Sequence, residues 1–256
     1  MVRSLIEKSL SVLMAGFFLL MGGCSPKYSV TGVTGGRFPV TEDYDECPDK
    51  DVAAIVELYQ GKVDSIMSPV IGYAAETLAA YRPESPLSNL MADILRMSVV
   101  RVTGKPADVG VMNMGGIRAS LPEGPVTVGT AYEIAPFENA LCVLTMDGES
   151  LLCLFRQMAA AHGEGLSGAR LVITPDGELK EAAVNGRPVD PKREYTVATI
   201  DYLAEGNDRM SAFRSAKLKT YPENMVLRNL LIDYIKECES EGRLIKASVE
   251  GRIKVW

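Results

Sequence analysis

Four stretches of the chain place apolar residues three or four positions apart, which is the spacing of an amphipathic helix. Between them lie short runs rich in β-branched residues, which are typical of strands. The predicted helices cover residues 51–67, 87–102, 147–161 and 224–237. The predicted strands cover residues 37–40, 108–112, 126–132, 140–146, 171–174, 182–184, 194–200 and part of 245–256. Because helices and strands interleave, the sequence predicts a mixed α/β (α+β) class.

The N-terminal segment differs from the rest. Residues 10–21 are almost entirely apolar and follow a weakly positive start. A run of about 12 residues is shorter than the roughly 20 that span a bilayer as a helix, and it fits the core of a secretory signal. The end of this run and the three residues after it resemble the lipobox of bacterial lipoproteins, which implies acylation at its cysteine; the segment is Leu20-Met21-Gly22-Gly23-Cys24. The alternative is an ordinary cleaved signal with an incidental cysteine.

These features predict three segments. We expect residues 1–23 to be a lipoprotein signal peptide, residues 24–48 a flexible tether rich in Gly, Thr, Ser and Pro, and residues 49–256 the folded domain. The expected location is the bacterial cell envelope, with the chain anchored by lipid at Cys24. Ser25 after that cysteine is compatible with sorting to the outer membrane, on its periplasmic side.

Charge and cysteine content narrow the range of possible functions. A net charge of −6, without long runs of one sign, argues against a nucleic-acid partner. Beyond Cys24, Cys142 and Cys153 lie in apolar runs and are predicted to be buried. Cys47 and Cys238 lie in polar surroundings, where they could pair in an oxidising compartment or stay free. None of the four has the close spacing of a zinc site.

Residues for hydrolysis by this chain alone are scarce. A two-metal phosphoesterase needs several histidine and carboxylate ligands, whereas the chain has a single histidine, His162, in a glycine-rich stretch. No glycine-rich stretch ends in Gly-Lys-Ser or Gly-Lys-Thr, so a P-loop is absent. We therefore expect no catalytic residue and no bound cofactor on this chain.

Three loops could instead bind an anionic ligand. Residues 113–118 follow a predicted strand and combine two glycines with Arg118, whose guanidinium suits phosphate or carboxylate. Read alone, such a Gly-Gly segment is more often only a tight turn. Residues 135–139, expected between two strands, carry Phe137, which could be a stacking face or a core residue. Residues 201–209 carry an aromatic residue, a glycine turn and a carboxylate.

In their order and spacing, these loops and their neighbours resemble the C-terminal domain of the 5'-nucleotidase family. The resemblance runs from about residue 65 to the C-terminus, and each motif is weak on its own. The segments that carry it are residues 84–93, 113–118, 136–139, 167–168, 185–188, 195–199, 202–208 and 251–253. One departure is the family's Gly-Gly-Asp-Gly, which is Gly206-Asn207-Asp208-Arg209 here; another is Leu-Gly-Asn, which is Leu87-Ser88-Asn89.

The resemblance implies a layered sandwich with two sheets between helices, in which this domain binds the nucleotide. A separate metallophosphatase domain would hold two metal ions and cut the phosphate ester. Phe137 and Tyr202 would stack on the base, and Asp208 would hydrogen-bond the ribose. Arg118 and Asn113 would face the phosphate or ribose side. The full set of implied substrate-binding residues is Arg82, Asn113, Gly116, Arg118, Phe137, Asn139, Tyr202 and Asp208, with Arg82 as a further phosphate contact.

The leading hypothesis is therefore the nucleotide- or nucleoside-binding half of a split 5'-nucleotidase in nucleotide catabolism. It implies a separately encoded, calcineurin-like metallophosphatase subunit that carries the divalent metal ions, and no phosphatase activity without it. One alternative is a non-catalytic nucleotide-binding lipoprotein of the envelope. Another is an envelope protein that retains only the fold.

Overall fold

The computed structural model describes residues 28–256 and separates into two units, one ending at Ala53 and one covering Ala54–Trp256. The predicted signal peptide and Cys24 lie outside the described residues. Residues 28–49 are exposed and form one short 3₁₀ helix, η1 (Glu42–Glu46). The strand predicted at residues 37–40 is wrong, because this stretch has no partner strand and stays irregular. The boundary expected after residue 48 stays a prediction.

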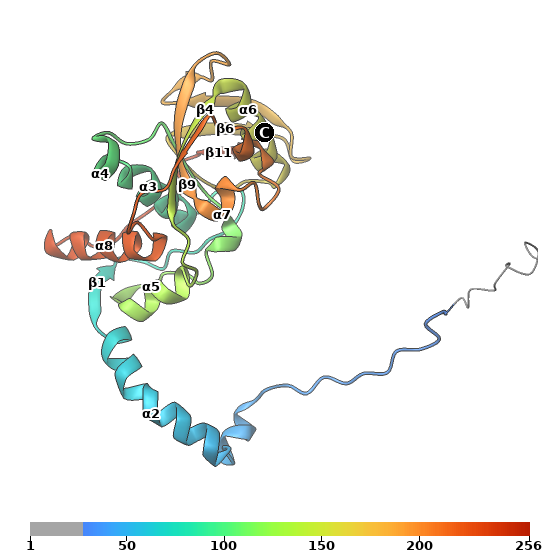
Figure 1. Cartoon of the computed structure of the whole chain (residues 1–256), viewed down its shortest axis with the longest axis vertical. Coiled ribbons are helices and arrows are strands. Elements are labelled where there is room, and N and C mark those ends of the chain that lie inside the picture. The colour runs from blue at the N-terminus through green and yellow to red at the C-terminus, as the bar shows by residue number, and fades with distance from the viewer. Residues whose placement is uncertain (1–27) are drawn as a thin grey trace, which may run out of the picture. The chain divides into compact units, whose positions relative to one another are not determined.

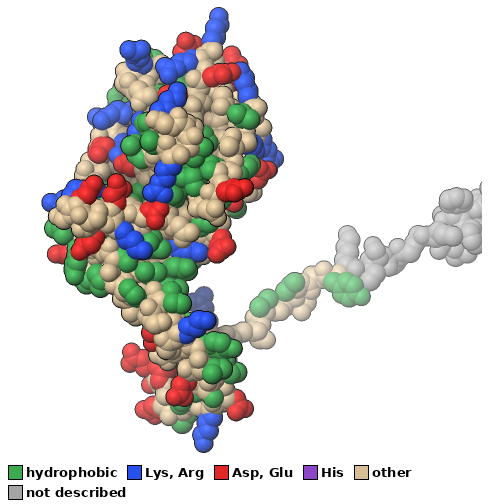
Figure 2. All heavy atoms as spheres, turned by 60° about the vertical axis from the view of Figure 1, so that its left-hand side comes forward, with side chains coloured by type: hydrophobic (Ala, Val, Ile, Leu, Met, Phe, Trp, Pro, Cys, Tyr) green, Lys and Arg blue, Asp and Glu red, His purple; other side chains and the backbone are tan. Residues whose placement is uncertain are grey.

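The first long helix, α2 (Lys50–Met67), begins and ends close to its predicted bounds. None of its residues is buried, so its apolar side chains are exposed; Figure 2 shows hydrophobic side chains at the surface of this helix, among acidic and basic ones. No helix within residues 28–256 is long and apolar enough to cross a membrane.

The largest sheet of the second unit has five strands in the order β10-β4-β9-β2-β5. Only the β2–β9 pair is parallel, and the other three pairs are antiparallel. The predicted strands at 108–112, 140–146 and 194–200 are confirmed, whereas two three-residue strands gave no sequence signal. The strands are β2 (Val109–Met112), β4 (Leu141–Asp147), β5 (Gly165–Ser167), β9 (Glu194–Ile200) and β10 (Leu218–Thr220).

Two smaller sheets accompany it. A four-stranded sheet has the order β11-β6-β7-β8, and a ribbon pairs β1 (Val70–Ala74) with β3 (Gly124–Thr127). The predicted meander is confirmed, since Asn185 and Gly186 both have positive φ in the tight turn between β7 and β8. The four strands are β6 (Ala169–Ile173), β7 (Leu179–Val184), β8 (Arg187–Pro188) and β11 (Ile253–Val255).

Helices cover the five-stranded sheet (Figure 1). The first, α3 (Pro86–Ser98), packs on β2, β5 and β9, while α6 (Gly148–Ala160) packs on β4 and β9 and also contacts β7 of the smaller sheet. The chain therefore has the predicted mixed α/β class with several sheets and helices. The predicted helix at 87–102 ends earlier, at Ser98, and a short α4 (Val100–Thr103) follows it. The predicted helix at 224–237 is shifted to α8 (Leu227–Ser240).

The predicted strand at 126–132 is wrong beyond Thr127. The chain there forms helix α5 (Val128–Ile134). The Thr127 hydroxyl accepts a hydrogen bond from the Thr130 backbone amide at 3.1 Å, and the Thr130 side chain reaches back to the Thr127 amide. This capping box begins a helix and outweighs the strand preference of the β-branched residues. The loop 135–139 consequently lies between α5 and β4, not between two strands.

All four described cysteines are free. Cys142 is buried as predicted, whereas Cys153 is exposed. The error at Cys153 has a geometric cause, since Leu151, Leu154 and Phe155 of α6 face the core and leave position 153 toward solvent. Cys238 is buried although its sequence neighbours are polar, because it lies on the inner face of α8.

Candidate functional site

The three loops singled out in the sequence meet at one edge of the five-stranded sheet. Strands β2 and β9 are parallel neighbours, so the loops after Met112 and Ile200 leave the sheet at the same edge. Strand β4 is antiparallel to β9, and its first residue, Leu141, pairs with Ile200. The loop before β4 therefore joins the other two. Ligands of open α/β sheets bind outside the carboxyl ends of strands in this way.

A cavity of about 390 Å³ lies among these loops. Seven of the eight predicted substrate-binding residues line it, although whether they bind a ligand stays a prediction. Arg82 is the exception, and Gly115 lines the cavity in addition. The lining residues are Asn113, Gly115, Gly116, Arg118, Phe137, Asn139, Tyr202 and Asp208.

Two aromatic side chains stand at the cavity with much of their surface in solvent. Phe137 is 49 % exposed, which decides against the reading of this residue as part of the core. Tyr202, from helix α7 (Asp201–Ala204), is 42 % exposed. Large apolar surfaces are usually buried, and exposed aromatic rings at a cavity offer flat surfaces for stacking.

The Phe137 loop is fastened by an arginine that sequence reasoning missed. Arg228, on α8, is buried and donates hydrogen bonds to the carbonyl oxygens of Ala135 and Pro136 at 3.4 and 3.1 Å. Its guanidinium also lies 4.0 Å from the ring centre of Tyr132 and pairs with Glu138 at 3.2 Å. It comes from a helix about ninety positions along the chain, so no local signal could have revealed it.

Asp208 ties two of the loops together. Its carboxylate accepts hydrogen bonds from the Tyr202 hydroxyl at 2.9 Å and from the Asn113 amide nitrogen at 2.5 Å. The hydrogen bond to Asp208 raises the pKa of Tyr202, because the phenol proton is held by a carboxylate. Asp208 and Arg209 have φ of +51° and +64°, so both residues keep a left-handed backbone, although Arg209 replaces the last glycine of the Gly-Gly-Asp-Gly motif.

The two glycines of the 113–116 turn, which forms the 3₁₀ helix η2 (Met114–Gly116), have different roles. A Cβ on Gly116 would come within 2.7 Å of Asn113 Oδ1 and 2.6 Å of the Met112 methyl group. A Cβ on Gly115 would make only ordinary contacts, at 3.7 Å, with Asn113 and Asp208. Gly116 is thus required for the close packing under Asn113.

Arg118 brings positive charge to the cavity. Its side chain is exposed and donates one hydrogen bond, to the Gly115 carbonyl oxygen at 3.2 Å. No carboxylate of residues 28–256 forms an ion pair with it. An anionic group in the cavity could therefore pair with this guanidinium without displacing an internal partner.

Arg82 lies apart from this set. Its guanidinium forms an ion pair with Glu164, whose other oxygen accepts a hydrogen bond from the Met114 backbone amide at 2.5 Å. Its expected contact with phosphate stays a prediction, since the structure places its charge against Glu164 and not among the residues that line the cavity.

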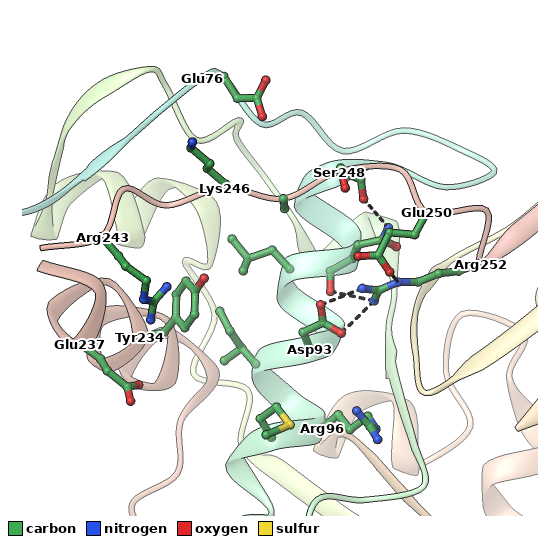
Figure 3. Close-up of a pocket in the computed structure, with 15 residues that line it drawn as sticks. Glu76, Asp93, Arg96, Tyr234, Glu237, Arg243, Lys246, Ser248, Glu250 and Arg252 are labelled. Carbon is green, nitrogen blue, oxygen red and sulfur yellow. Dashed lines mark hydrogen bonds and ion pairs between the residues drawn. The ribbon is translucent and has the colours of Figure 1, made fainter. Parts of the chain in front are cut away.

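A second cavity, of about 730 Å³, lies between α3, α8 and the C-terminal segment (Figure 3). Three of its charged side chains, Asp93, Glu250 and Arg252, form ion pairs with one another. Arg252 lies between Asp93, which it contacts through two bonds of 2.8 Å, and Glu250, at 3.0 Å. This network fastens the C-terminal segment to α3. The smaller cavity, with its unpaired guanidinium and exposed rings, is the better candidate for a ligand site.

The described residues contain no group of three or more His, Cys, Asp or Glu side chains that could hold a metal ion. His162 is exposed, with a φ of +58°, in the turn after α6. The geometry of the smaller cavity therefore supports binding of an aromatic, anionic ligand.

Comparison with known proteins identifies the family. The family model described as 5'-nucleotidase, C-terminal domain, matches residues 70–215, more than half of the chain. The chain belongs to this family. The match includes all three loops of the cavity.

Individual relatives agree with this assignment. A crystal structure of a 5'-nucleotidase precursor from Thermus thermophilus has a TM-score of 0.69 and 28 % identity, over 82 % of this chain and 44 % of that one. A cell wall protein of Listeria monocytogenes is 28 % identical over 80 % of this chain and 29 % of its own length. The protein UshA of Escherichia coli is 32 % identical over 40 % of this chain and 19 % of its own. The chain thus spans less than half of the length of each.

Proposed function

We propose that this chain is the nucleotide- or nucleoside-binding half of a split 5'-nucleotidase-type phosphoesterase in nucleotide catabolism. The observation that carries the proposal is the cavity of residues 113–118, 137–139 and 202–208, where two exposed aromatic rings, an unpaired guanidinium and a carboxylate converge. A nucleotide matches these groups one by one, since it combines a flat base, a hydroxylated sugar and an anionic phosphate.

The roles of the residues follow from their chemistry. Phe137 and Tyr202 stack on the base, a contact worth about 1–3 kcal/mol per base. Arg118 pairs with the phosphate through its planar fork. Asp208, which is already bonded to Tyr202 and Asn113, accepts a hydrogen bond from the ribose.

Hydrolysis requires a second component. We propose a separately encoded, calcineurin-like metallophosphatase that holds two divalent metal ions and attacks the phosphate ester. This chain then holds the nucleoside, and its binding energy orients the phosphate toward the metals of that partner. The proposal assigns no metal ion to this chain.

The proposed location is the bacterial cell envelope, with a lipid at Cys24 as anchor. The similarity to a cell wall protein supports an envelope location. Treatment of cells with an inhibitor of the lipoprotein signal peptidase tests the anchor. The unprocessed precursor should accumulate, and its absence would contradict lipidation at Cys24.

Reconstitution tests the catalytic part. The full chain is mixed with a metallophosphatase from the same genome, AMP and Mn²⁺, and released phosphate is measured. We expect phosphate release only when both proteins are present, and a strong loss with the Phe137→Ala, Tyr202→Ala double variant. Activity that is independent of this chain, or unchanged in the double variant, would contradict the split enzyme. AMP binding without any gain in hydrolysis would favour the non-catalytic nucleotide-binding lipoprotein.

A further inference from the structure

A buried carboxylate lies behind the ligand cavity and is not among the residues that line it. Glu164, in the turn between α6 and β5, is only 3 % exposed. One of its oxygens pairs with Arg82, and the other accepts the Met114 backbone N–H at 2.5 Å. These two contacts connect the turn after α6, which carries Glu164, with the loop before α3, which carries Arg82, and the turn after β2, which carries Met114.

We propose that Glu164 is a positioning residue of the ligand site, which together with Arg82 fixes the 113–116 turn in the shape that directs Asn113 onto Asp208. The inference rests on the proposed function of the cavity. It assigns to Glu164 a role that acts through the turn, without contact with the ligand.

The hydrogen bonds form a continuous series. Arg82 holds Glu164, and Glu164 holds the amide of Met114, the first residue of η2 within the turn. Asn113, immediately before it, donates to Asp208, and Asp208 accepts from Tyr202. A movement of Glu164 therefore reaches the carboxylate and one aromatic ring of the cavity through the backbone of a three-residue turn.

The ionised carboxylate is required at this position. Protonated Glu164 would keep one weaker acceptor and lose its attraction to Arg82. Burial raises the pKa of Glu164, and the bonds from Met114 and Arg82 oppose this shift, while the negative charge of Asp208 adds to it. The charged groups that face Glu164 are thus Arg82, from the loop before α3, and Asp208, from the loop after α7.

The inference makes a prediction that separates positioning from phosphate contact. If Arg82 acts through Glu164, both Arg82→Gln and Glu164→Gln should lower the affinity for adenosine and for AMP by the same factor. We expect this factor to be about tenfold, as for the loss of a charge-assisted hydrogen bond. If Arg82 contacts phosphate directly, Arg82→Gln should lower the affinity for AMP and leave the affinity for adenosine unchanged.

Calorimetric titration of the full chain with each ligand measures this difference. The double variant, Arg82→Gln with Glu164→Gln, should bind both ligands almost as tightly as either single variant does, because the two residues act as one unit. Glu241→Gln is the matched control, since it removes a carboxylate from an exposed ion pair with Arg243 outside the cavity. Unchanged adenosine affinity in Glu164→Gln would overturn the inference.

The pH profile gives a readout that a purely structural role would not move. Because the pKa of Glu164 is raised, adenosine affinity should begin to fall at a pH above 4.5, the ordinary value, as the carboxylate takes up a proton. Glu164→Gln should remove this portion of the profile. A profile that is identical in both proteins would contradict the inference.

Amide exchange tests the same contact without ligand. The Met114 amide proton of the wild type should exchange slowly, and Glu164→Ala should accelerate its exchange while the amides of β9 stay protected, which shows that the fold is kept. Equal Met114 exchange in both proteins would overturn the inference. If the wild type binds neither adenosine nor AMP, the proposed function fails, and Met114 exchange still decides whether Glu164 holds the turn.

Discussion

The hydroxyl of Tyr202 donates a hydrogen bond of 2.9 Å to the carboxylate of Asp208, six positions further along the chain. The same carboxylate accepts the side-chain amide of Asn113 from a different strand end. These two bonds fix one aromatic ring of the cavity relative to the turn that also carries Arg118. The orientation of the ring is therefore set before a ligand arrives, which reduces the entropy lost on binding.

This bond predicts a change in the acidity of Tyr202. Asp208→Asn should lower the pKa of Tyr202 toward its ordinary value of 10.0, because an amide can donate to the phenolate whereas a carboxylate repels it. Titration of phenolate absorbance, with Tyr202→Phe in each background to isolate this residue, measures the shift. An unchanged pKa would show that the bond is absent in solution.

Arg228 should matter for ligand binding although it does not line the cavity. Arg228→Met keeps an apolar stem but removes the hydrogen bonds to the 135–138 loop. We expect a loss of about 1–3 kcal/mol in unfolding free energy and weaker adenosine binding, because Phe137 is no longer held. Urea unfolding and calorimetry measure the two effects.

Arg170→Met is the matched control, since Arg170 also donates to backbone carbonyl oxygens, those of Glu250 and Gly251, away from the cavity. It should leave adenosine affinity unchanged. Equal affinities in the two variants would contradict a role of Arg228 in holding Phe137.

Arg209 should limit stability. Its φ of +64° is unfavourable for a residue with a side chain by about 1 kcal/mol, and glycine adopts it freely. Arg209→Gly should therefore raise the free energy of unfolding, or leave it unchanged where the greater freedom of the unfolded glycine offsets the gain. Urea unfolding measures this, with Arg187→Gly as control at an exposed position without positive φ. If Arg209→Gly lowers the free energy of unfolding as much as the control does, the backbone at Arg209 is not strained.

Much of the ligand cavity could be predicted from the sequence because its residues lie in short local motifs. Asn113 to Arg118, Phe137 to Asn139 and Tyr202 to Asp208 each follow or precede a strand whose hydrophobic pattern is plain. The parallel pairing of β2 and β9 then brings the motifs together. The resemblance to a family supplied their shared role, which no single motif could.

The supporting contacts could not be predicted, since they depend on tertiary packing. Arg228 and Glu164 come from distant elements, and charged side chains of their kind are mostly solvent-exposed, so the sequence gives no reason to expect either one buried. Arg82 shows the same limit, because its ion pair with Glu164 depends on how two loops pack. The strand expected through Tyr132 failed for a local reason, the capping box at Thr127, which competes with β propensity.

The central claim is that the cavity binds a nucleoside between Phe137 and Tyr202. Calorimetric titration of the full chain with adenosine, before and after Phe137→Ala and Tyr202→Ala together, tests it most directly. Tyr73→Ala is the control, since Tyr73 is 44 % exposed, as Tyr202 is, but lies on β1. We predict measurable binding to the wild type and the control, and a loss of at least about tenfold in the double variant. Absence of heat with the wild type, or equal affinity in all three proteins, would contradict the account.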